Sequence, residues 1–167
     1  MLRTISINAL RFILLILLQV LLIDNLQLST MCNPYIYVLF LLTLPVDEPR
    51  WLDVILGFLI GLFIDMFSNT LGLHCFAGTL VGYLRYYVIK LFVDEEMRTT
   101  GTPGYETFGA IEYIKYVVML VTIHHATLFA LEAFTLTNGW WLIGRVFISS
   151  LVSSALILVA SLFDKAQ

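Results

Sequence analysis

Long apolar stretches that carry almost no charge determine what this chain can fold into. In 167 residues there are six of them, over 5–23, 31–45, 51–67, 71–91, 113–134 and 140–163. A helix that crosses the hydrocarbon core of a bilayer needs about 20 predominantly apolar residues, and most of these stretches have that length. The chain is 60% hydrophobic and 13% charged, with a mean hydropathy of +0.93, whereas soluble domains are roughly 45–50% apolar and 25% charged. The sequence therefore predicts a single all-α integral membrane domain over 1–167, a compact bundle of about six transmembrane helices.

The stretch 31–45 is the shortest of the six. It begins with Asn33 and Pro34, a cap followed by a proline in the first helical turn. As a helix, the residues from Pro34 to Leu44 would rise only about 16 Å. We therefore expect this span either to extend back through Met31 or to cross a locally thin bilayer.

Lysine and arginine set the orientation of the bundle, because short loops that carry them stay in the cytoplasm. They lie before the first stretch, between the second and third, around the segment 93–112 and at the end of the chain, whereas the three opposite connections carry none. We expect both termini and the loop 93–112 to be cytoplasmic. The stretch 5–23 resembles a signal peptide but lacks a small-residue cleavage site after it, so we expect it to be retained as a helix.

Two neighbouring stretches each contain a pair of glycines four residues apart, Gly57 with Gly61 and Gly78 with Gly82. Small residues at this spacing line one helix face and let two backbones approach closely in lipid. The pattern predicts a tight helical hairpin. The glycines serve either this internal packing or the binding of a partner helix.

Ionisable residues inside the stretches are expensive in lipid and need partners. Three pairs are predicted: Asp65 with His74 near the outer ends of the hairpin helices, Asp53 with Arg85 nearer their cytoplasmic ends, and Glu132 with Arg145 at the outer ends of the last two helices. We expect the first pair to lock the hairpin, with a proton or ligand site as the alternative.

No motif in the chain specifies a cofactor or a catalytic centre. His124 and His125 are adjacent, so on a helix they point about 100° apart and do not chelate one metal together. Cys32 and Cys75 both map near the outer face, where a disulfide is possible, but isolated thiols in a membrane protein are more often unpaired. The net charge of −3 argues against nucleic acid as a partner. A binding role in the membrane is therefore predicted, not an enzymatic one.

The residues of the hairpin resemble those of a known family. The stretch GFLIGLFIDMFS from Gly57, the following LGLH and the later LVGYLR that ends at Arg85 are similar to the hairpin of the rod shape-determining protein MreD family. Asn33-Pro34 and Leu44-Pro45 around the short second stretch also resemble that family. The similarity in size, spans and loop length covers the whole chain, whereas the specific motifs lie between Asn33 and Arg85.

This resemblance implies a non-enzymatic scaffold subunit of the bacterial cell-elongation complex, which supports sidewall peptidoglycan synthesis and cell shape. The implied partners are the membrane lipid and MreC, and in the larger complex RodA, a class B penicillin-binding transpeptidase and MreB. The glycine-lined faces would then receive a partner helix.

The MreD family also resembles the substrate-binding subunits of energy-coupling-factor vitamin transporters, which leaves a second function open. Those subunits dock their partner through alanine-rich positions on the first helix, whereas the first stretch here has only Ala9. An enclosed pocket lined by Trp140, Trp141, His74 and Glu132 would favour this transport function.

Overall fold

The computed structural model describes residues 2–26, 31–70, 72–95, 101–133 and 139–163, and the regular elements in these ranges are helices. Five of them are long: α1 (Leu2–Leu18), α3 (Arg50–Ser68), α4 (Leu73–Phe92), α6 (Ala110–Ala133) and α7 (Gly139–Phe163). α1 continues as a π-helical turn (Gln19–Ile23) and a 3-10 turn (Asp24–Leu26), and α2 (Leu39–Leu42) and α5 (Tyr105–Phe108) are single turns. The predicted all-α class is confirmed.

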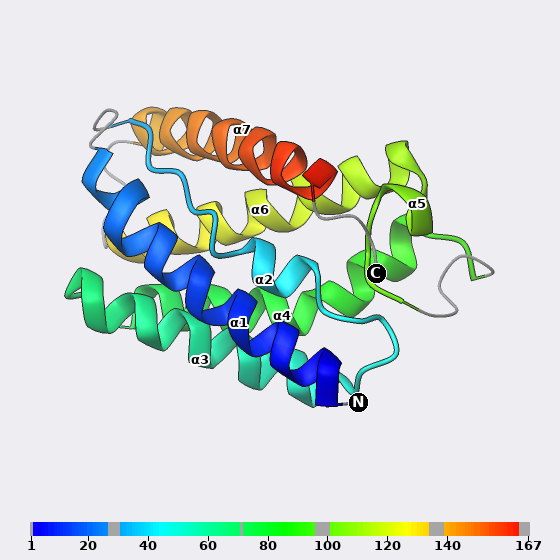
Figure 1. Ribbon diagram of the computed structural model, residues 1–167. Coiled ribbons are helices and arrows are strands. Elements are labelled where there is room, and N and C mark those ends of the chain that lie inside the picture. Colours follow the sequence, from blue (N-terminus) through cyan, green and yellow to red (C-terminus); the bar gives the residue numbers. More distant parts are fainter. Residues whose placement is uncertain (1, 27–30, 71, 96–100, 134–138, 164–167) are drawn as a thin grey trace.

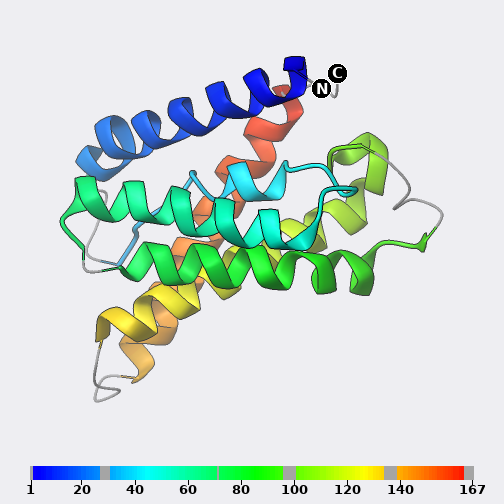
Figure 2. The ribbon, with the colours of Figure 1, turned by 90° about the horizontal axis from the view of Figure 1, so that it is seen from below.

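The long helices run from one end of the molecule to the other (Figures 1 and 2). α1, α3 and α6 begin, and α4 and α7 end, at the same end, where α5 also lies (Figure 1). The direction of the long helices therefore alternates along the chain in the way that the positions of lysine and arginine predict. The start of α1 and the end of α7 lie at the same end of the molecule.

Within the described ranges, three helices are long and apolar enough to cross a membrane, namely α3, α6 and α7, with mean hydropathies of 1.9, 1.6 and 2.3. The chain is therefore a membrane protein. α1 and its π-helical continuation contribute a shorter apolar helix over Ile7–Ile23. α4 is not among the three, since its 20 residues include His74, Arg85 and Lys90.

The stretch 31–45 differs most from expectation, because the helix predicted over its whole length is reduced to the one turn of α2. We call residues 31–45 the interior segment. Its residues 31–38 are not helical, and they run between α1, α7 and the α3–α4 hairpin (Figure 1). A nearly extended chain advances up to about 3.3 Å per residue, twice as far as a helix. This short stretch can therefore cover most of the length of a span without a second turn of helix.

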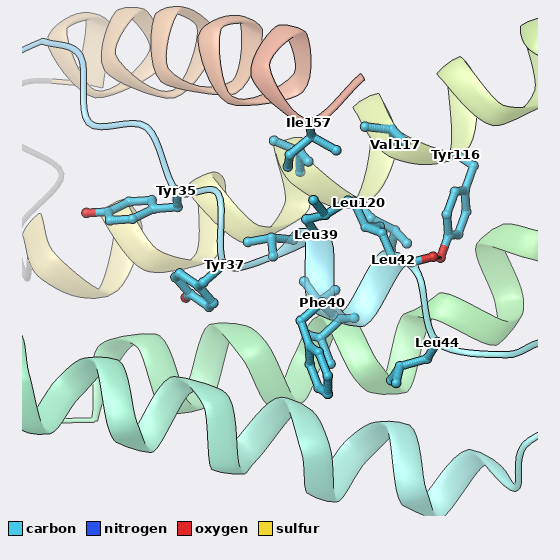
Figure 3. Close-up of a cluster of buried hydrophobic side chains, with 14 of the residues drawn as sticks. Tyr35, Tyr37, Leu39, Phe40, Leu42, Leu44, Tyr116, Val117, Leu120 and Ile157 are labelled. Atoms are coloured by element: carbon cyan, nitrogen blue, oxygen red, sulfur yellow. Dashed lines mark hydrogen bonds between the residues drawn. The ribbon is translucent and has the colours of Figure 1, made fainter. Parts of the chain in front are cut away.

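Side chains of the interior segment form the centre of the core. Every residue from Tyr37 to Leu44 is buried, and Phe40 points toward the hairpin while Leu39 and Leu42 face α6 and α7 (Figure 3). Non-helical backbone at membrane depth is tolerated only where protein encloses it. Helices on all sides supply that enclosure here.

The predicted loop 93–112 is more structured than a solvated connection. α5 lies within it, α6 begins at Ala110, and Phe108 is 1% exposed. The Val46 amide donates to the Gly101 carbonyl at 3.0 Å, and the Tyr105 hydroxyl donates to the Leu158 carbonyl at 3.0 Å. The described part of this loop therefore packs against the end of the bundle.

Candidate functional site

The four glycines lie in the interface between α3 and α4. All four are buried, and a Cβ added at Gly78 would lie 2.5 Å from the Gly57 carbonyl oxygen. Cβ atoms added at Gly61 or Gly82 would likewise collide with backbone of the opposite helix, at His74 and Asp53. The predicted tight hairpin is present, and only glycine fits at these positions.

Each glycine face is covered by the other helix of the hairpin, which favours the internal-packing alternative for these residues.

Asp65 joins the two helices at the turn of the hairpin. Its carboxylate lies 3.0 Å from Nδ1 of His74 and accepts the backbone N–H groups of His74 at 3.1 Å and Cys75 at 2.8 Å, and it also contacts the Thr70 hydroxyl. An anion in this position satisfies N–H groups that the first turn of α4 leaves without helical partners. The predicted pair with His74 is thus part of a cap that fixes the start of α4.

Arg85 connects the hairpin to the end of the interior segment. It is 2% exposed, and its Nη1 lies 2.7 Å from Oδ2 of Asp53, which forms the second predicted pair. Its Nε donates to the Tyr116 hydroxyl of α6 at 3.1 Å, and its remaining N–H groups reach the carbonyls of Leu44 and Pro45. The Tyr116 hydroxyl in turn donates to the Leu42 carbonyl at 3.1 Å. The cluster therefore satisfies the backbone where α2 ends.

Polar side chains of α7 and α1 do the same for the non-helical part of the interior segment. Ser149 Oγ accepts the Asn33 N–H at 3.0 Å, and Ser153 Oγ accepts the Tyr35 N–H at 3.0 Å. Gln19, which is fully buried, accepts the Ile36 N–H at 2.8 Å and donates to the Pro34 carbonyl at 3.2 Å. Successive backbone groups thus obtain from side chains the hydrogen bonds that a helix would supply internally.

His124 and His125 belong to this arrangement, and both are fully buried on α6. Nε2 of His124 lies 2.5 Å from the Tyr37 hydroxyl. His125 donates from Nδ1 to the Val121 carbonyl at 2.8 Å and accepts from Ser153 at 3.1 Å. The two histidines therefore support the interior segment at separate points.

Glu132 and Arg145 form the third predicted pair, at the opposite end of the bundle from Arg85. The two side chains meet at 2.9 Å, with the guanidinium 4.1 Å from the centre of the Phe129 ring. Arg145 is 9% exposed, whereas Glu132 is on the surface. The pair links the end of α6 to the first part of α7.

Neither cysteine is in a disulfide, and Cys32 and Cys75 are free thiols. Among the described residues, no group of three or more histidine, cysteine and acidic side chains is arranged to hold a metal ion. Trp140 is 89% exposed whereas His74 is 4% exposed, so the side chains named for a vitamin pocket do not share one enclosed space.

Sequence reasoning missed Gln19, Ser149 and Ser153. The available signal was their position, since the serines lie four residues apart on one face of an apolar helix, beside Ser150 and Ser154. Without the course of the interior segment, such a face is equally typical of helix packing.

Comparison of the chain with protein-family models, with curated proteins and with solved structures finds no match.

Proposed function

We propose that this chain is a non-enzymatic scaffold of the bacterial cell-elongation complex, similar to the MreD family, which binds MreC in the cytoplasmic membrane. Both termini and the loop 93–112 would face the cytoplasm. RodA, a class B penicillin-binding transpeptidase and MreB would join in the larger complex.

The observation that supports this proposal most is that the interior segment fills the space between the helices. Several buried polar side chains bond to the backbone of the interior segment, whose own side chains fill the space between the helices: Gln19, Arg85, Tyr116, Ser149 and Ser153. Groups committed to structural hydrogen bonds are not free to bind or transform a substrate. The surface that remains is apolar and exposed, as on Leu14 of α1 and Phe147 of α7. Such a protein is suited to contact other membrane helices.

The experiment is reconstitution with a candidate MreC in lipid nanodiscs, followed by co-purification. Photo-crosslinking residues at Leu14 and at Phe147 report contact on two separate helix faces, 53% and 67% exposed in the isolated chain. We expect a stable complex and a crosslink to MreC from at least one face. An unrelated single-span protein at the same density is the control for chance encounter.

The absence of both complex and crosslink, with protein that is folded and monodisperse, would refute the scaffold proposal. Stoichiometric capture of a vitamin by the isolated chain would instead favour transport. Gly61→Leu, which places bulk against the His74 backbone, should destabilise the hairpin itself. If that variant lost the MreC complex but kept its stability, the result would indicate that the glycines contact the partner.

A further inference from the structure

A cavity of about 290 Å³, lined by apolar and charged side chains, lies where α3 begins and α4 ends. Its wall includes three carboxylates, from Glu48, Asp53 and Glu95, and three cations, from Arg50, Arg85 and Lys90. The cavity therefore carries both signs of charge at the end of a candidate membrane span.

Two acceptors in the cavity wall lack a donor. Oε2 of Glu48 and Oδ1 of Asp53 are buried and accept no hydrogen bond, although Asp53 is only 3% exposed. A buried acceptor without a partner destabilises the fold, and more so when it is charged. In addition, burial and the nearby Asp53 charge raise the pKa of the Glu48 carboxyl, which indicates that no cation fully compensates its charge. A hydrogen-bond donor that also carries a positive charge would satisfy both oxygens.

The cations differ in how far they are already engaged. Arg85 is held by Asp53, Tyr116 and the end of the interior segment. Arg50 instead stacks on the Tyr86 ring at 3.4 Å, and the ammonium of Lys90 lies 5.7 Å from the same ring. Within the part of the chain that the structure describes, neither has a carboxylate in ion-pair contact. Both are therefore available to an anionic group.

The surroundings indicate a lipid. Trp51 and Leu91, next to Arg50 and Lys90 in the chain, are 62% and 66% exposed. Tryptophan at the end of a span is typical of the headgroup zone, and exposed apolar side chains nearby would contact acyl chains. A lipid headgroup reaches this site directly from the bilayer.

We propose that this cavity binds the headgroup of a phospholipid with a primary amine, a phosphoethanolamine. The ammonium donates to Glu48 and Asp53, and the phosphate lies against Arg50 and Lys90. The ethanolamine linker keeps the ammonium close to the phosphate, which matches a cavity wall that carries both carboxylates and cations. A choline headgroup has the same charges but no N–H, so it cannot satisfy the two carboxylate oxygens. This site is independent of the MreC proposal.

The test is native mass spectrometry of the full chain released from membranes of equal phosphatidylethanolamine, phosphatidylcholine and phosphatidylglycerol with identical acyl chains. The ammonium makes two charge-assisted hydrogen bonds that choline cannot make, so we expect at least tenfold more bound phosphatidylethanolamine than phosphatidylcholine. Equal binding of these two lipids by the wild-type chain would overturn the proposal without any variant.

Variants separate the two ends of the headgroup. Glu48→Gln should lower the preference over phosphatidylcholine, because Asp53 is then left as one of the two carboxylates that accept the ammonium, whereas Lys90→Gln should weaken both lipids by a similar factor. Glu106→Gln and Lys115→Gln change exposed residues outside the cavity and should leave the binding as in the wild type. Retention of the full preference by a folded Glu48→Gln would contradict the assignment.

A last arm distinguishes the lipid from a soluble compound with the same chemistry. Glycerophosphoethanolamine at the concentration of the lipid should not displace it, because it lacks acyl chains. Full displacement would refute a lipid as the occupant.

Discussion

Replacing Ser153 with alanine tests whether side chains hold the interior segment in place. The Ser153 hydroxyl is fully buried, accepts the Tyr35 N–H at 3.0 Å and donates to His125 at 3.1 Å. The change leaves the Tyr35 N–H buried without a partner and removes one hydrogen bond from His125. At about 1–3 kcal/mol for a buried group without a partner, we expect a loss of about 1–3 kcal/mol in the free energy of unfolding.

α7 offers a matched control for this change. Ser150 is on the same helix and 5% exposed, but its hydroxyl has no hydrogen-bond partner. Ser150→Ala removes the same atom without breaking a bond, so it should be neutral or slightly stabilising. Unfolding by SDS in mixed micelles, followed by tryptophan fluorescence, gives both values. Equal effects of Ser153→Ala and Ser150→Ala would refute the role of Ser153.

Three further changes test the hairpin, the Arg85 cluster and the loop before α3. Gly61→Ala puts a Cβ against the His74 backbone and should cost several kcal/mol in the same unfolding assay, whereas Gly144→Ala, with open space around it, should cost nothing. Equal stability of the two variants would contradict the close approach of α3 and α4. Arg85→Met leaves the Asp53 carboxylate buried and unpaired, so we expect the free energy of unfolding to fall by about 3–5 kcal/mol. Adding Asp53→Asn should restore part of this loss, and no recovery in the double variant would show that the pair is uncoupled. The raised pKa of Glu48 contributes stability that is complete below its ordinary value of 4.5 and is lost as the pH rises through the raised value. In detergent without phosphatidylethanolamine, Glu48→Gln should therefore melt at a higher temperature than the wild type at pH 7. An unchanged or lower melting temperature would count against this reasoning.

Much of the helical framework could be predicted from the sequence because the physics there is local. A run of apolar residues about 20 long requires a helix in lipid. The predicted 51–67 differs from α3 by one residue at each end, and the predicted 140–163 differs from α7 by one residue at its start. The glycine spacing predicted the close approach of α3 and α4 for the same reason. The three ion pairs also followed from the cost of an unpaired charge in a membrane.

The interior segment could not be predicted, since its conformation depends on residues far away in the chain. A short apolar stretch bounded by prolines is compatible with a helix until its partners are known. Those partners include Gln19, 17 residues before Ile36, and Ser153, 118 residues after Tyr35. The tertiary hydrogen bonds thus override the local helical preference of this stretch.

The protection of the interior segment against hydrogen exchange tests the central claim most directly. In the intact protein in nanodiscs, we expect the amides of Tyr35 and Ile36 to exchange as slowly as amides in the middle of α6, although they are outside any helix. Ser153→Ala should selectively accelerate exchange at Tyr35. Exchange of both amides within seconds in the wild type would contradict an interior built around this segment.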